Sequence, residues 1–206
     1  MDSSGGSPTL VVSAPLTTHA PGRSGPTLTR PVRILAVDPG TRYMGVAFLV
    51  GPELIRADVE HVREPGMATK EIPKKAQVVL RRWIEHYEPD VIAVEQAFFA
   101  QSKRSRHLQR ITQAITIVAK AKCLPVQLYP PTIVRRLICK QGRPTRLAVA
   151  RVIATEYFPW LQPYYDKEAK KSWWRKHYWT HLFDAIAVGL ACQAQAGARR
   201  TSRRAA

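Results

Sequence analysis

The sequence predicts an α/β fold in which a mixed β-sheet is flanked by helices. Two observations indicate this fold: short apolar runs bounded by turn residues alternate with segments whose apolar residues have helical spacing. Hydrophobic residues make up 45% of the 206 residues, which is enough for the core of one domain. We expect that domain at residues 32–196, between an N-terminal extension (1–31) and a C-terminal tail (197–206).

Five segments have the length and apolar content of strands. The first three follow one another closely and predict an antiparallel meander. The fourth is introduced by Glu88 and Pro89, and the fifth begins at Pro125. The predicted strands are residues 32–37, 44–50, 55–62, 90–94 and 125–129.

The segments between and after these strands predict helices. Apolar residues recur at helical spacing in the two long segments, and Pro131 and Pro144 each lie where a shorter helix would begin. The last segment is an apolar helix that contains one acidic residue, Asp184. The predicted helices are residues 68–87, 108–121, 130–139, 144–157 and 181–194.

The composition excludes several classes of protein. No apolar run approaches the roughly 18 residues of a membrane-spanning helix. Cys123, Cys139 and Cys192 are odd in number, far apart and without a CxxC pair. Neither a disulfide framework nor a structural zinc site is therefore expected, and a reducing compartment is the default.

The charge predicts binding to a polyanion, most simply a nucleic acid. The 32 Lys and Arg against 15 Asp and Glu give a formal net charge of +17. No acid lies between Glu95 and Glu156, although twelve Lys or Arg do. A ribosomal-type protein could show the same pattern, so this stretch alone predicts binding and no chemistry. Its first candidate contacts are Lys103, Arg104 and Arg106.

The two ends of the chain differ from the predicted domain. Residues 1–31 are rich in Ser, Thr, Pro and Gly and predict a disordered extension. Few acids occur there, which would also suit an organellar transit peptide, but the arginines are few. Residues 197–206 carry four arginines and no acid, so we expect a flexible tail with nonspecific affinity for phosphate.

Three acidic residues adjoin apolar segments. Asp38 follows the run at 34–37 and is either a turn residue before Pro39 or a carboxylate at the end of a central strand. Glu95 follows the run at 91–94, where a carboxylate is partly desolvated and is either paired with an Arg or part of a site. Asp184 and His181 share one helical face, as a structural hydrogen-bonded pair or as site residues.

Brought together, these three carboxylates would repel one another, and a divalent cation would remove the repulsion. Oxygen ligands favour Mg²⁺ or Mn²⁺. Two such ions can activate a water molecule and stabilise a leaving oxygen, which is the chemistry of phosphodiester hydrolysis. The acids would then provide the catalyst, and the acid-free basic stretch would provide affinity for the substrate.

In these residues the sequence resembles the RuvC family of Holliday-junction resolvases, nucleases of the RNase H-like superfamily. Three motifs within roughly residues 32–195 carry the resemblance: residues 34–41 with Gly45, residues 94–99 and residues 181–187. The resemblance implies an RNase H-like sheet of three antiparallel strands followed by two parallel ones. It also implies Mg²⁺-dependent cleavage, with two ions and with Mn²⁺ as a substitute, by a homodimer that cuts four-way DNA junctions symmetrically. A branch-migration helicase is an expected partner, and the nucleoid in the cytoplasm the expected location.

The resemblance also implies roles for individual residues. Asp38, Glu95 and Asp184 match the metal-binding acids of the family, and His181 stands where the family often has another Asp. His181 is therefore expected to bind metal or to orient water. Phe98 matches an aromatic residue that stacks at the junction, with core packing as the alternative. Phosphate contacts near the scissile bond are expected from Arg135 or Arg136 and from Arg146.

Residues 157–179 form an aromatic and basic insertion that looks longer than the corresponding family segment. They hold nine of the seventeen aromatic residues in the chain. Trp173 and Trp174 lie beside Lys and Arg, a combination that suits stacking on unpaired bases. Packing of these rings against the sheet or a dimer partner is the alternative.

Two other functions stay open on the sequence. One is an RNase H-like nuclease of different specificity, such as a YqgF-like RNA-processing protein or an enzyme for flap or other branched DNA. The other is a catalytically silent nucleic-acid-binding protein, against which the retained acids argue.

Overall fold

Five strands form one sheet in the computed structural model, which describes residues 30–96, 103–140, 144–170 and 178–205. Their order across the sheet is β3-β2-β1-β4-β5. The first three strands pair antiparallel, whereas β4 pairs parallel with both β1 and β5, which confirms the predicted mixed sheet. The strands are β1 (Arg33–Asp38), β2 (Tyr43–Val50), β3 (Glu53–His61), β4 (Val91–Glu95) and β5 (Val126–Tyr129).

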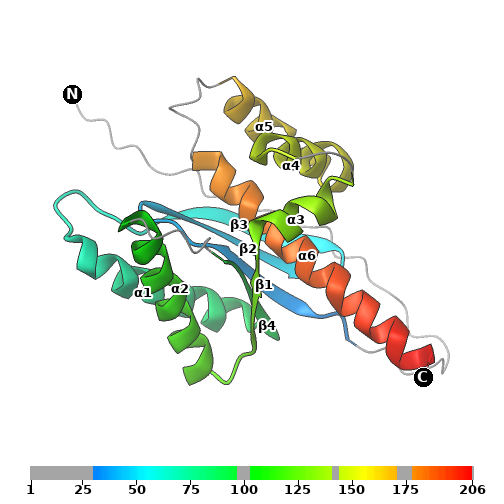
Figure 1. Cartoon of the computed structure of the whole chain (residues 1–206), viewed down its shortest axis with the longest axis horizontal. Coiled ribbons are helices and arrows are strands. Elements are labelled where there is room, and N and C mark those ends of the chain that lie inside the picture. The colour runs from blue at the N-terminus through cyan, green and yellow to red at the C-terminus, as the bar shows by residue number, and fades with distance from the viewer. Residues whose placement is uncertain (1–29, 97–102, 141–143, 171–177, 206) are drawn as a thin grey trace.

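Helices cover both faces of this sheet, so the domain has three layers (Figure 1). One face is covered by α1 (Ile72–Tyr87) and α2 (Lys103–Ala121). The opposite face is covered by the long α6 (Tyr178–Ala205), around which three shorter helices pack. The shorter helices are α3 (Pro131–Ile138), α4 (Arg146–Val152) and α5 (Gln162–Ala169).

The helix bounds differ from the predicted ones where local chemistry changes the backbone. A 3-10 turn (Thr69–Glu71) precedes α1, and Pro73 then lies in the first turn of that helix. The predicted helix at 144–157 divides into α4 and one π-helical turn (Ile153–Tyr157). Helix α5 was not predicted; it lies in the aromatic insertion and has Pro163 in its first turn. None of the helices in the described ranges is long and apolar enough to cross a bilayer.

Helix α6 is longer at both ends than the predicted 181–194. It continues to Ala205 through most of the segment predicted as a tail, where Ala and Arg are good helix formers and no Pro interrupts the chain.

The strands next to the helices are apolar on both faces because both faces are covered. In β1, Ile34 and Ala36 belong to the core under α6, whereas Leu35 and Val37 belong to the core under α1 and α2. Side chains alternate along a strand, so Asp38, which follows Val37, points to the same α6 face as Ile34 and Ala36.

Glycine at position 45 allows α6 to lie directly on β2. A Cβ built on Gly45 would stand 1.8 Å from the backbone oxygen of His181, so the helix backbone occupies the place of a side chain. Gly45 pairs with Asp38 across β1 and β2. This close approach brings the first turns of α6 to the carboxyl end of β1.

Candidate metal centre and nucleic-acid interface

Two of the predicted acids lie side by side because their strands are parallel neighbours. Val37 of β1 pairs with Val94 of β4, and Asp38 and Glu95 come next at the carboxyl ends of these strands. The alternation of side chains turns both carboxylates to the α6 face of the sheet. The local structure therefore places two acids next to each other, facing the same helix.

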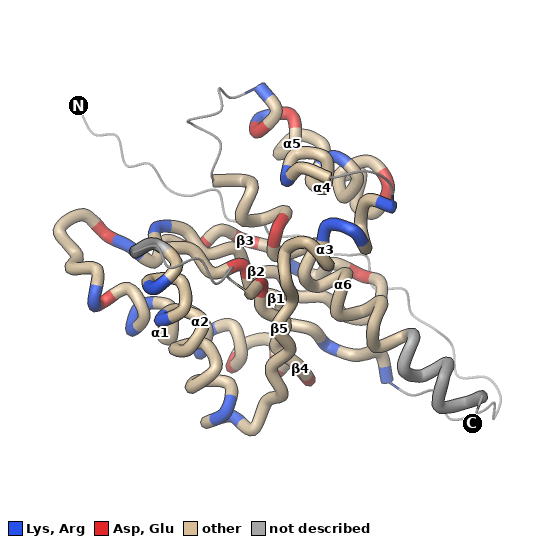
Figure 2. The backbone as a smooth tube through the Cα atoms, viewed as in Figure 1, with Lys and Arg blue, Asp and Glu red and all other residues tan. Residues whose placement is uncertain are grey.

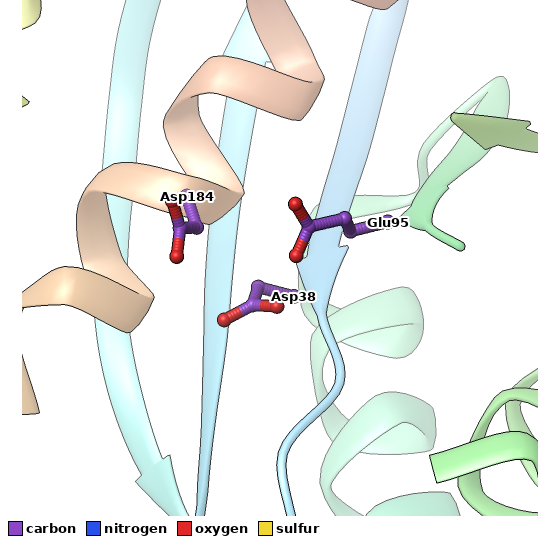
Figure 3. A group of neighbouring side chains, drawn as sticks. All are labelled: Asp38, Glu95 and Asp184. Atoms are coloured by element: carbon purple, nitrogen blue, oxygen red, sulfur yellow. The ribbon is translucent and has the colours of Figure 1, made fainter. Parts of the chain in front are cut away.

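Asp184 of α6 completes a cluster of three carboxylates. An oxygen of each of Asp38, Glu95 and Asp184 lies within 4.8 Å of the others. The side chains point toward one another between the sheet and the helix (Figure 3). Only 3% of Asp38, 7% of Glu95 and 6% of Asp184 is exposed, so water screens their repulsion poorly.

Burial and mutual repulsion perturb the pKa values of these acids. Burial, with the negative charges of Asp38 and Asp184, raises the pKa of Glu95 to about 10. Burial and the charge of Asp38 raise the pKa of Asp184 to about 7, although Arg146 acts to lower it. Burial also acts to raise the pKa of Asp38, but the charge and hydrogen bond of His181 outweigh it and hold that pKa below its ordinary value. At neutral pH the metal-free site therefore favours an ionised Asp38 and a protonated Glu95, whereas Asp184 is divided between its two forms.

His181 is the hydrogen-bond partner of Asp38. Its Nδ1 lies 2.5 Å from Asp38 Oδ2. Burial acts to lower the pKa of His181, but the charge of Asp38 and the hydrogen bond to it raise that pKa overall. A protonated Nδ1 donates to the carboxylate, and the ring of Tyr43, 6.3 Å away between centroids, packs beside the imidazole. His181 lies next to the cluster through its hydrogen bond to Asp38, but it is not one of the three clustered ligand groups. Its role as a metal ligand stays a prediction.

Asp184 has a different partner, Arg146 at the start of α4. Arg146 Nε lies 3.4 Å from Asp184 Oδ2. The geometry does not make a hydrogen bond, and Asp184 Oδ2 is buried without one among the described residues. A buried carboxylate oxygen in this state is costly unless a cation binds it.

The donor set fits a hard divalent cation. It consists of carboxylate oxygens, which Mg²⁺ and Mn²⁺ prefer, and it includes the buried oxygen of Asp184 that lacks a hydrogen bond. Asp38, Glu95 and Asp184 are the residues that would hold such an ion. Their role as ligands stays a prediction, whereas their convergence is a feature of the fold.

Asp38 and Glu95 line a cleft of about 460 Å³ with basic walls, and Asp184 lies behind them without lining it. Arg135 and Arg146, both predicted phosphate contacts, line it. Other lining residues were not predicted as site residues, among them Arg42, Tyr43 and Gln96. The signal was present, since Arg42 and Tyr43 follow the first acidic motif within five residues and Gln96 follows Glu95 directly.

The other predicted nucleic-acid contacts either do not line the cleft or lie where the structure describes no side chain. Arg106 is exposed on α2 and Arg136 is exposed on α3, and neither lines the cleft. Figure 2 shows basic positions on both helices. Lys103 and Arg104 begin α2, and the structure does not describe their side chains. Phe98, Trp173 and Trp174 lie outside the described residues, so their predicted stacking stays a prediction.

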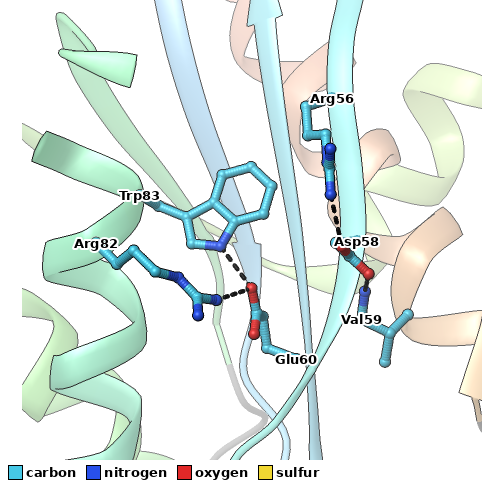
Figure 4. Close-up of polar contacts among 6 residues, drawn as sticks. All are labelled: Arg56, Asp58, Val59, Glu60, Arg82 and Trp83. Atoms are coloured by element: carbon cyan, nitrogen blue, oxygen red, sulfur yellow. Dashed lines mark hydrogen bonds and ion pairs between the residues drawn. The ribbon is translucent and has the colours of Figure 1, made fainter. Parts of the chain in front are cut away.

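A larger cavity of about 630 Å³ lies between β3 and α1, away from the three acids. Its charged side chains satisfy one another. Arg82 pairs with Glu60, which also accepts a hydrogen bond from the indole of Trp83 at 2.7 Å, and Arg56 pairs with Asp58 at 3.1 Å (Figure 4). Because these charges are paired, the smaller cleft is the better candidate for chemistry.

Comparison with known proteins points to one family. The family described as "Crossover junction endodeoxyribonuclease RuvC" matches residues 34–156. The RuvC of Thermobifida fusca is 29% identical over 130 residues, which cover 60% of this chain and 70% of that protein. The RuvC of Frankia casuarinae is 32% identical over 129 residues, which cover 59% and 74%.

Solved structures show the same fold. Thermus thermophilus RuvC in complex with a Holliday junction substrate has a TM-score of 0.59 at 20% identity and covers 78% of this chain and 91% of its own. The yeast mitochondrial Holliday junction resolvase Ydc2 has a TM-score of 0.57 at 14% identity and covers 84% and 83%. The family match contains Asp38, Glu95 and Arg146, whereas His181 and Asp184 lie after its end.

Proposed function

Because the chain belongs to the RuvC family of crossover junction endodeoxyribonucleases, we propose that it resolves four-way DNA junctions by metal-dependent phosphodiester hydrolysis. The observation that supports this most is the convergence of Asp38, Glu95 and Asp184 beside a cleft with basic walls, which Asp38 and Glu95 line. An isolated basic surface would account for binding alone. The buried acids add the means to cut.

We infer that the three acids hold two Mg²⁺ ions and that Mn²⁺ can replace them. Such ions supply a nucleophilic water and neutralise the charge that develops on the leaving oxygen. The side chains of the protein would position the ligands and the substrate phosphates. His181 keeps Asp38 ionised and fixes its orientation, and Arg42 and Arg135 on the cleft wall would bind phosphates next to the scissile bond.

Symmetric resolution requires two cuts, so we propose a homodimer with one cleft in each protomer. The family resemblance adds a branch-migration helicase as the expected partner and the nucleoid as the expected site of action. Residues 32–196 would form the nuclease unit. The N-terminal extension and the basic end of the chain would add to it without supplying catalytic groups.

Cleavage of a four-way junction by the protein and by Asp38→Asn tests this function. We expect Mg²⁺-dependent paired nicks in opposite strands of the junction. A linear duplex and a structured RNA should be cut far less. Asp38→Asn removes the carboxylate next to His181 and should lower the rate by on the order of 10²–10³-fold, since metal-assisted charge stabilisation contributes several kcal/mol.

The readout is a denaturing gel with each junction strand labelled in turn. Asp58→Asn is a matched control, because Asp58 lies in the other cavity and pairs with Arg56. Cleavage of RNA alone would favour the RNA-processing alternative. Junction binding with no cutting under any metal would favour a silent binding protein, and either result would overturn the proposal.

A further inference from the structure

Arg146 reaches from the surface of the cleft to a buried acid. Thr145 caps α4 by accepting a hydrogen bond from the backbone N–H of Ala148 at 3.1 Å, which fixes Arg146 as the first residue of the helix. The Arg146 side chain is 42% exposed, whereas that of Asp184 is 7% exposed. The guanidinium therefore has one side toward solvent and its Nε 3.4 Å from Asp184 Oδ2.

Two of the three acids in the site have an ion-pair partner among the described residues. His181 pairs with Asp38 and Arg146 pairs with Asp184, whereas Glu95 has no ion-pair partner among the described residues. Arg135 also faces the cleft from α3, without an ion pair to any of the three acids in the described part of the chain. Arg146 is thus the cation paired with Asp184 in the metal-free site, where it favours the ionised form of that acid.

A metal ion and Arg146 would compete for Asp184. An ion such as Mg²⁺ binds a carboxylate oxygen at about 2.0–2.1 Å, which brings two positive charges next to the guanidinium. Two positive groups at such a short distance repel each other strongly at a poorly solvated site. The guanidinium has another attractive position available, because it lines the cleft and Arg binds phosphate through paired hydrogen bonds.

We propose that Arg146 is a counter-charge that holds Asp184 until a DNA phosphate draws the guanidinium away. DNA binding and metal binding would then strengthen each other. The metal centre would be fully occupied only in the complex with DNA. This inference rests on the proposed nuclease function and adds a coupling between its two ligands. By thermodynamic linkage, each ligand must change the affinity of the other by the same factor.

Binding of Mn²⁺ to the full chain without DNA tests the first half of the inference. Arg146→Gln should lower the Kd for Mn²⁺ by about tenfold, within the range of ordinary coupling between sites. Arg146→Lys keeps the positive charge and should stay near the wild type. Arg151→Gln removes an exposed charge from the same helix and is the matched control. The signal of free Mn²⁺ in electron paramagnetic resonance gives each Kd, and thermal melts confirm that the variants fold.

Unchanged or weaker Mn²⁺ binding in Arg146→Gln would overturn the inference and leave the proposed function intact. Absence of saturable Mn²⁺ binding in the wild type would contradict the metal-dependent function itself.

Junction binding tests the second half. Saturating Ca²⁺, with strand integrity checked on a gel, should tighten binding of a fluorescent four-way junction relative to EDTA. That gain should be several times smaller for Arg146→Gln than for Arg151→Gln. Equal gains in the two variants would overturn the coupling.

Discussion

Replacing Glu95 with Gln is expected to stabilise the metal-free protein and to abolish metal-dependent cleavage. Burial and the charges of Asp38 and Asp184 raise the pKa of Glu95 to about 10, so the folded state holds a proton that the unfolded state releases above about pH 4.5. For an acid with a raised pKa, stability is lost as the pH rises from the unfolded value toward the folded one. Gln is neutral and removes this loss.

The gain should therefore grow with pH. Near pH 5 we expect little difference, and at pH 8 an increase in the free energy of unfolding on the order of several kcal/mol. For a chain of this size each kcal/mol corresponds to about 2–4 °C in Tm. Melting curves in EDTA at both pH values measure the effect, with added Mg²⁺ in a parallel series.

Mg²⁺ should stabilise the wild type and have little effect on Glu95→Gln, because a ligand raises stability only when it binds the folded state. Glu85→Gln is the matched control, since Glu85 is exposed on α1 and pairs with Lys122 at 3.2 Å. A lower Tm for Glu95→Gln than for the wild type at pH 8 would contradict the description of the site as strained by like charges. Stabilisation of Glu95→Gln by Mg²⁺ to the same extent as the wild type would contradict the role of Glu95 as a metal ligand.

Substituting Gly45 with Ala should damage both stability and the site. The added Cβ would stand 1.8 Å from the backbone oxygen of His181, and a helix backbone cannot yield as a side chain can. Overpacking of this kind costs about 1–3 kcal/mol or more. The first turns of α6 carry both His181 and Asp184, and a displacement of about 1 Å in a catalytic group can lower a rate by about 10²-fold.

Gly189→Ala provides the comparison, because Gly189 lies on α6 later along the helix than His181 and Asp184. Its Cβ would meet Cδ1 of Leu49 at 2.4 Å, which is the far end of a flexible side chain. We expect Gly189→Ala to lose less stability and to keep junction cleavage, whereas Gly45→Ala loses cleavage even under conditions where it stays folded. Equal losses of cleavage in the two variants would show that the close approach of α6 at Gly45 does not position the acids.

All three acids were predicted as site residues from the sequence, but only the adjacency of Asp38 and Glu95 follows from local strand chemistry. Asp38 and Glu95 each follow an apolar run directly, and the ends of neighbouring parallel strands meet at one edge of a sheet. Their shared face follows from the alternation of side chains. The position of Asp184 depends on how closely α6 approaches the sheet, which is set by the missing side chain at Gly45 and is not visible in a helical pattern.

Contacts between distant segments were beyond the reach of sequence patterns. The pairing of Arg146 with Asp184 joins α4 to α6, and spacing along the chain contains no sign of it. Helix α5 was missed because its own apolar pattern is weak, although Pro163 marked its beginning. Arg42 and Tyr43 were overlooked as part of the cleft because their residue types are common at exposed turns.

Anomalous diffraction from crystals containing Mn²⁺ tests the central claim most directly, which is that the three buried acids form a metal centre. We expect at least one anomalous peak within coordination distance, about 2.0–2.2 Å, of carboxylate oxygens of Asp38, Glu95 and Asp184. The peak should disappear in Glu95→Gln crystals. Mn²⁺ bound elsewhere, or a cluster that stays without Mn²⁺ in crystals whose protein cleaves junctions, would contradict the account.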